Sequence, residues 1–109
     1  MSILDQAKEH FASIETQSLE IPEWGLTVFW RPWTVNERQK VWGAIKQSGK
    51  EAELSARVLI AKALDKDLKN VFSVGDLRTL CFDVDSSVLE RVALSIIGEQ
   101  QSSDDTLKN

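Results

Sequence analysis

The sequence predicts a single small α+β domain, mainly α-helical, with four or five helices, one N-terminal β-hairpin and a disordered C-terminal tail. The chain has 109 residues, 42% of them hydrophobic, which is enough for one core but not for two. Near Thr34 the spacing of apolar residues changes from alternation to helical steps. From Glu99 onward nearly every residue is polar. We therefore assign residues 1–98 to the domain and residues 99–109 to a disordered polar tail.

Residues 4–14 are expected to form a short amphipathic helix. Apolar residues recur there at three- and four-residue steps, and they are Leu4, Ala7, Phe11 and Ile14. A β-hairpin is predicted near residues 18–31, because a Pro-Glu-Trp-Gly turn separates an alternating segment from one rich in β-branched and aromatic residues. A hairpin alone is marginal in water, so it must pack on helices or on a strand of a partner.

Two helices are predicted after the hairpin. The sequence from Thr34 to Glu37 has the pattern of a capping box, so a helix should run from there to about Gln47. Gly49 suits the left-handed conformation in which helices often end. The next helix, about residues 51–64, is apolar around most of its circumference, which indicates a central position.

Two further helices follow a polar turn at residues 65–70. Ser73 and Asp76 resemble a second capping box at the start of a helix over about residues 74–81. The last helix is expected over about residues 85–97, with Gly98 as its C-cap. The central positions of these periodic segments give the predicted core: Leu54, Val58, Ile60, Ala61, Leu64, Phe72, Leu77, Leu89, Val92 and Ile96.

The side chains that usually carry catalysis are scarce. His10 is the only histidine, and Cys81 is the only cysteine and lies among apolar residues, where a free thiol behaves as a small buried hydrophobe. The five glycines stand singly, so no phosphate-binding loop is present. We therefore expect no enzyme, no cofactor and no metal site.

Charge and cysteine content restrict the partners and the compartment. The net charge is -4 and the basic residues are scattered, which disfavours nucleic acid as the main ligand. A single cysteine cannot form an internal disulfide, which favours a reducing, cytosolic compartment. We expect no membrane association, because no apolar run approaches the ~20 residues of a membrane-spanning helix and the first residues do not resemble a secretion signal.

Aromatic residues are concentrated in and just after the predicted hairpin. Five of them, Trp24, Phe29, Trp30, Trp33 and Trp42, fall within nineteen residues. They form either a corner of the core or an exposed surface that docks another chain. Tryptophan and arginine are enriched at binding hot spots. The candidate partner-binding residues are therefore Phe29, Trp30, Arg31, Trp33, Arg38 and Trp42. The apolar rows of the last helix are an alternative docking surface.

The stretch from Glu51 to Leu80 resembles the tail assembly chaperones of long-tailed bacteriophages (siphoviruses), and the likeness extends over roughly residues 20–98. The shared features are an apolar helix, an acidic turn, a Phe followed by Ser, an acidic short helix and a final apolar helix. They correspond to Ala56–Leu64, Asp65–Lys69, Phe72-Ser73, Asp76–Leu80 and Val88–Ile97. The acidic turn of the family often carries a glycine where this chain has Leu68.

This resemblance implies a role in virion morphogenesis. Such chaperones bind the tape measure protein, keep it soluble in the host cytoplasm, present it to the tail tube and are absent from the mature virion. Members of the family are expected to form homo-oligomers, and in many a frameshifted longer form recruits the major tail (tube) protein. The alternative is a structural or connector protein of the tail, and an enzyme or a small DNA-binding regulator is a further alternative.

Overall fold

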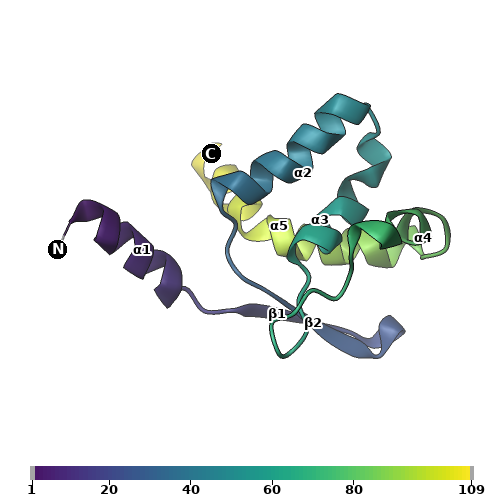
Figure 1. Ribbon diagram of the computed structural model, residues 1–109, viewed down its shortest axis with the longest axis horizontal. Helices are drawn as coiled ribbons and strands as arrows, with labels where there is room; N and C mark the ends of the chain where they lie inside the picture. Colours follow the sequence, from purple (N-terminus) through teal and green to yellow (C-terminus); the bar gives the residue numbers. More distant parts are fainter. Residues whose placement is uncertain (1, 109) are drawn as a thin grey trace.

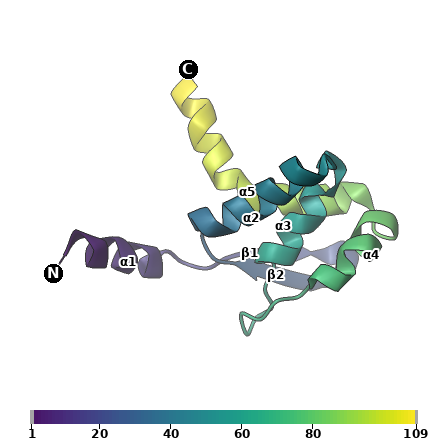
Figure 2. The ribbon, with the colours of Figure 1, turned by 45° about the horizontal axis from the view of Figure 1, so that its top comes forward.

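A computed structural model describes the backbone of residues 2–108 and the side chains of residues 2–98. The described elements follow one another as a helix, a two-stranded hairpin and then four helices, with short 3-10 turns between them. The predicted fold class is therefore confirmed. In Figures 1 and 2 the hairpin lies beneath helices α2, α3 and α5, while α1 projects away from this body.

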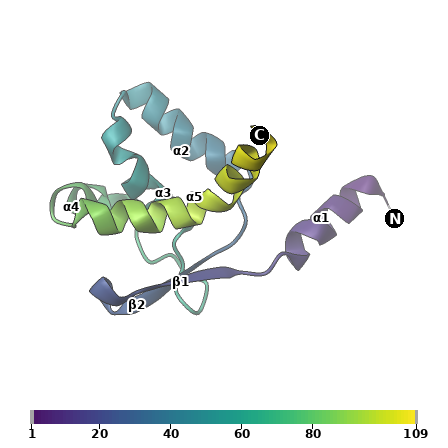
Figure 3. The same cartoon turned by 180° about the vertical axis from the view of Figure 1, so that it is seen from behind.

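Helix α1 (Ile3–Ser13) matches the predicted N-terminal helix. It starts at Ser2, whose Oγ accepts a hydrogen bond from the Asp5 amide at 3.1 Å. None of its residues is buried, and Ile3 and Leu4 are 84% and 70% exposed. Figure 3 shows from behind that α1 stands apart from the other helices. The first residues of its apolar stripe, Ile3 and Leu4, are therefore left in water, and only its C-terminal end is in contact with the rest of the chain, where Arg31 lies over the Phe11 ring.

The hairpin forms within one residue of its predicted position. Strand β1 (Gln17–Ile21) pairs antiparallel with β2 (Leu26–Trp30), and the 3-10 turn η1 (Pro22–Trp24) joins them. Gly25 closes the turn at φ 66°, in the left-handed region that favours glycine. The face of the hairpin that points toward the helices buries Ile21, Val28 and Trp30.

The outer edge of β2 is partly covered by the chain itself. The backbones of Phe29 and Leu64 exchange two hydrogen bonds of 2.8 Å, and Leu64 bridges in turn to Asn70. Between these two bridge residues the acidic turn folds around Asp65, whose Oδ1 accepts from the amides of residues 67 and 69. Leu68 has φ 63° in this turn. It thus adopts the backbone conformation that a glycine would adopt without strain.

Helices α2 (Val35–Ser48) and α3 (Leu54–Lys62) form an antiparallel pair joined by Gly49 and the 3-10 turn η2 (Glu51–Glu53). The predicted capping box at the start of α2 is present, since Thr34 and Glu37 exchange hydrogen bonds of 3.0 and 3.1 Å. Gly49 ends α2 at φ 72°, as predicted.

The chain then continues through η3 (Val74–Asp76), α4 (Leu77–Phe82) and α5 (Ser86–Lys108). Ser73 caps this segment by donating its backbone N–H to Asp76 Oδ2 at 2.8 Å. The prediction that the last helix ends with Gly98 as its C-cap was wrong, because the backbone of α5 continues as a helix to Lys108. The side chains of residues 99–109 lie outside the part that the structure describes, so the disordered tail stays a prediction.

The core lies between the hairpin, α3 and α5. Four of the predicted core residues are buried: Val58, Leu89, Val92 and Ile96. The other six are only half-buried, and they are Leu54, Ile60, Ala61, Leu64, Phe72 and Leu77. The prediction was wrong for Leu54, Ile60 and Ala61 because α3 is not covered on all sides. Its buried residues face α5 and the hairpin, while its remaining apolar residues lie toward the surface. Leu64, Phe72 and Leu77 lie after α3, at positions that the neighbouring elements cover only in part.

Candidate functional site

The structure divides the residues of the predicted binding surface among four places. Trp30 is 7% exposed and belongs to the core. Phe29 is half-buried, and its backbone is bonded to Leu64. Arg31 contacts the C-terminal end of α1, where its guanidinium donates hydrogen bonds to the carbonyls of Phe11 (2.9 Å) and Ile14. These three residues therefore do not share one exposed surface.

Trp33, Arg38 and Trp42 do come together, and we call them the tryptophan–arginine stack. The two indole rings meet edge to face with centroids 5.4 Å apart. The Arg38 guanidinium lies 5.2 Å from the Trp33 centroid and 5.6 Å from the Trp42 centroid, within cation–π range of both. All three side chains are half-buried, so each keeps part of its surface available to a partner.

A buried lysine, Lys62, lies against the Trp33 ring of the stack. Lys62 is 4% exposed, and its Nζ donates to Glu37 Oε1 at 2.8 Å and to the Pro32 carbonyl at 3.0 Å. The same ammonium lies 5.2 Å from the Trp33 ring centroid. Burial alone would raise the pKa of Glu37, but its hydrogen bonds with Lys62 and Thr34 outweigh burial and lower this pKa. The carboxylate therefore stays ionised beside the lysine at neutral pH.

The stack is also fixed to the last helix. The Trp33 indole N–H donates to the Ile96 carbonyl at 3.1 Å. A groove of about 470 Å³ lies beside it, lined by Ile14, Gln17, Trp30, Pro32, Trp33, Ile96 and Ile97. Because its ring is held by Arg38, Lys62 and this hydrogen bond, Trp33 presents a pre-organised surface, which lowers the entropy lost on binding.

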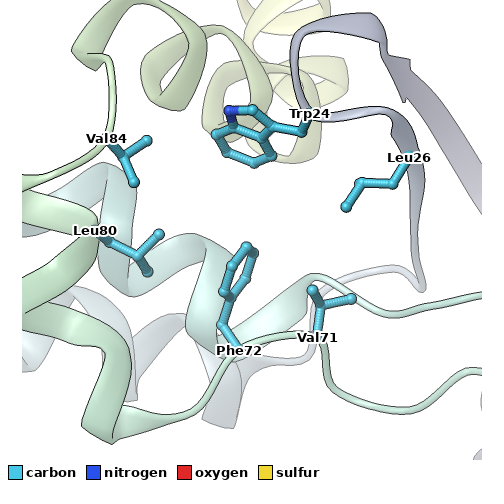
Figure 4. A pocket seen from close by; sticks show the side chains of 6 residues that line it. All are labelled: Trp24, Leu26, Val71, Phe72, Leu80 and Val84. Atoms are coloured by element: carbon cyan, nitrogen blue, oxygen red, sulfur yellow. The ribbon is translucent and has the colours of Figure 1, made fainter.

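A second surface, the apolar pocket, lies between the hairpin turn and α4. It has a volume of about 290 Å³ and is lined by Trp24, Leu26, Val71, Phe72, Leu80 and Val84. Figure 4 shows these side chains gathered around one open space. Trp24 and Phe72 meet edge to face at 6.3 Å between centroids. The pocket was missed by the sequence analysis, which placed Phe72 in the core. Its residues come from four separate segments that no local pattern connects.

An ion pair lies next to the apolar pocket. Glu23 and Arg91 form a bidentate ion pair, in which Arg91 Nη2 donates to Glu23 Oε1 at 2.7 Å and Arg91 Nη1 donates to Glu23 Oε2 at 2.9 Å. The hydrogen bond from Arg91 is the main reason that the pKa of Glu23 falls to about 2. This contact joins η1 to α5 across 68 positions of sequence.

The two residues considered for catalysis are separate from both surfaces. His10 is exposed on α1, and Cys81 is half-buried on α4. Burial raises the pKa of the Cys81 thiol, so it is protonated at neutral pH. Among the described residues, no cluster of three metal-ligating side chains occurs, and no helix is long and apolar enough to cross a membrane.

The apolar rows of the last helix belong to the core. Val88, Leu89, Val92, Ala93, Ile96 and Ile97 are all buried. Leu94 lies outside these rows and is 61% exposed. The described part of α5 therefore offers little apolar surface for a second docking site.

Comparison with known proteins identifies a fold relative. The chain is similar to the solved structure of the bacteriophage HK97 tail assembly chaperone, with a TM-score of 0.56 and 19% identity. The match covers 87% of this chain and 97% of the other. No protein-family model and no curated protein sequence matches the chain. The likeness predicted from the sequence is therefore confirmed at the level of the fold.

Proposed function

We propose that the chain is a non-enzymatic phage tail assembly chaperone, which binds the tape measure protein and keeps it soluble during tail morphogenesis. The observation that carries this proposal is the fold shared with the HK97 tail assembly chaperone over nearly the whole of both chains. The surface chemistry agrees with such a role, because large apolar side chains are distributed over several elements. Val35, Val74, Phe82 and Leu94 are each more than 60% exposed. A long helical client presents many similar apolar stripes, which suits distributed contacts.

The tryptophan–arginine stack is the proposed contact with the client. Trp33 and Trp42 are large, rigid and partly exposed, and residues of this type dominate binding energies. Arg38 holds both rings in place, so it acts mainly by positioning them. Trp30 supports this surface from the core, and Arg31 fixes the adjoining helix α1. Phe29 is half-buried on β2, apart from the stack, and would contribute only as a separate contact.

A second copy of the chain is a further proposed partner. The outer edge of β1 has no backbone partner among the described residues, and such edges recruit other strands. Light scattering should therefore show oligomers, and a monomer at every concentration would count against this proposal. We also propose that the chaperone acts in the host cytoplasm and is absent from the mature virion. A frameshifted longer form would recruit the tail tube protein.

Co-expression tests the proposed function. The tape measure protein of the phage that encodes this chain should stay soluble and co-purify when the two are expressed together, and it should precipitate when expressed alone. Trp33→Ala should reduce its capture. Leu4→Ala is the control, because it removes an exposed apolar side chain on α1, outside both the stack and the exposed residues named above. Circular dichroism should first show both variants to be folded. A tape measure protein that is equally insoluble with and without the chain would contradict the proposal.

A further inference from the structure

We propose that the apolar pocket binds one large apolar side chain of a positively charged amphipathic helix. The identity of this helix as a segment of the tape measure protein rests on the proposed function. The chemistry of the pocket and of the residues around it stands on the structure alone.

The lining of the pocket selects an apolar group. All six lining residues are apolar, so the pocket lacks the placed polar side chains that orient a small polar ligand or a cofactor. Its volume of about 290 Å³ is near the lower end of the range for ligand sites. It therefore suits a single anchor, such as a leucine or phenylalanine side chain, which a helix presents at three- and four-residue intervals.

The pocket is open to a partner of this kind. Trp24, Val71, Phe72 and Val84 are half-buried, and Leu26 is 38% exposed at its rim. In Figure 4 the rings of Trp24 and Phe72 reach toward the space from opposite sides, with Leu26 at one end and Val84 at the other. An entering side chain would contact two aromatic rings as well as aliphatic groups, and it would cover apolar surface that is now in water.

The charge of the residues around the apolar pocket determines which kind of helix binds there. Three exposed acidic residues are direct chain neighbours of the lining: Glu23 precedes Trp24, and Asp83 and Asp85 flank Val84. Arg91 neutralises Glu23. Neither aspartate forms an ion pair within the described part of the chain. Asp85 Oδ2 accepts a hydrogen bond from the Val88 amide at 3.1 Å. The surroundings of the pocket are therefore negative, which favours lysine and arginine beside the anchor residue.

A peptide assay tests the inference without the natural client. The probe is a synthetic amphipathic helix of about 18 residues, with a leucine stripe on one face and lysines on the other. Its twin carries glutamates in place of the lysines. Fluorescence anisotropy with the full chain should show tighter binding of the lysine peptide, and the difference should shrink at ~0.5 M salt.

Two variants locate the binding site. Leu26→Ala removes an apolar side chain at the rim and should weaken the lysine peptide roughly fivefold at either salt concentration. Asp83→Lys should weaken it roughly fivefold at low salt and less at high salt. The control is Glu9→Lys, which makes the same change of charge on α1, far from the pocket (Figure 1). It should leave the affinity unchanged.

Three results would overturn the inference: equal affinity for both peptides, unchanged binding by Leu26→Ala, or oligomers of this chain that Leu26→Ala dissociates. The last result would assign the pocket to a second copy. The outcomes also separate this inference from the proposed function. If both variants capture the tape measure protein normally, the pocket inference fails and the chaperone proposal stands. If the lysine peptide binds as expected and no tape measure protein is captured, the pocket inference stands and the chaperone proposal fails.

Discussion

Neutralising Glu37 should destabilise the fold by leaving a buried positive charge without its partner. The perturbation is Glu37→Gln. Glutamine keeps a side-chain oxygen for the Thr34 amide, which is now 3.0 Å from Glu37 Oε1, so the capping box survives. The ion pair with Lys62, at 2.8 Å, does not.

The magnitude follows from the burial of the two partners. Breaking a fully buried ion pair costs ~3–5 kcal/mol, whereas surface pairs contribute ~0–1 kcal/mol. The Lys62 side chain is 3% exposed and that of Glu37 is 36% exposed, so water screens one partner only. In the variant, Lys62 still donates a hydrogen bond to the Pro32 carbonyl and still lies against the Trp33 ring. We therefore expect a loss of about 2 kcal/mol, or about 8 °C in Tm for a chain of this size.

Urea denaturation followed by circular dichroism measures this loss. The double variant Lys62→Met with Glu37→Gln should recover part of it, because both charges are then absent. The pH dependence of the free energy of unfolding gives a second check, because the direction of its change is known. The pKa of Glu37 is lowered in the folded state, so its contribution is present above its ordinary pKa and disappears as the pH falls through the folded value. A loss below about 0.5 kcal/mol for Glu37→Gln would refute the reasoning.

Three further predictions concern the stability of the fold. The Glu23–Arg91 contact should stabilise the fold above pH 4.5 and be lost as the pH falls toward 2; Arg91→Leu should remove this part of the pH dependence in thermal unfolding, and an unchanged profile would contradict the assignment. Leu68→Gly should stabilise the chain by about 0.5–1 kcal/mol, because it relieves a positive φ, and a lower urea midpoint would contradict this. Ile96→Ala should cost ~2–5 kcal/mol and Leu54→Ala about half as much, because Ile96 is buried whereas Leu54 is only half-buried. Equal losses would mean that α3 packs differently in solution.

The elements that the sequence predicts correctly are those with a complete local signal. Thr34 and Glu37 cap α2, Gly49 ends it, and the hairpin forms around its turn, because each of these features depends on residues only a few positions apart. Only four of the ten predicted core residues are buried, and the reason is different. Periodicity identifies an apolar helix, but not whether a neighbouring element covers each of its sides, and this is where Leu54 and Ile60 differ from Val58.

The candidate site depended on contacts that no local pattern encodes. Arg31 was predicted at a binding surface, but α1 lies within reach and offers unpaired carbonyls at its end. No local pattern marks Lys62 as buried, because its partners Glu37 and Pro32 lie at least 25 positions earlier. The apolar pocket required the hairpin turn to meet the segment before α4. Clustering of tryptophan and arginine did indicate the stack of Trp33, Arg38 and Trp42.

The central claim is that the chain escorts the tape measure protein during assembly and then leaves. Quantitative mass spectrometry tests it most directly, by comparing infected or induced cells with purified virions of the phage that encodes the chain. We expect the chain to be recovered from the cells in complex with the tape measure protein, and to be missing from mature particles. A constant number of copies in every virion would contradict the account and would instead identify a structural component of the tail.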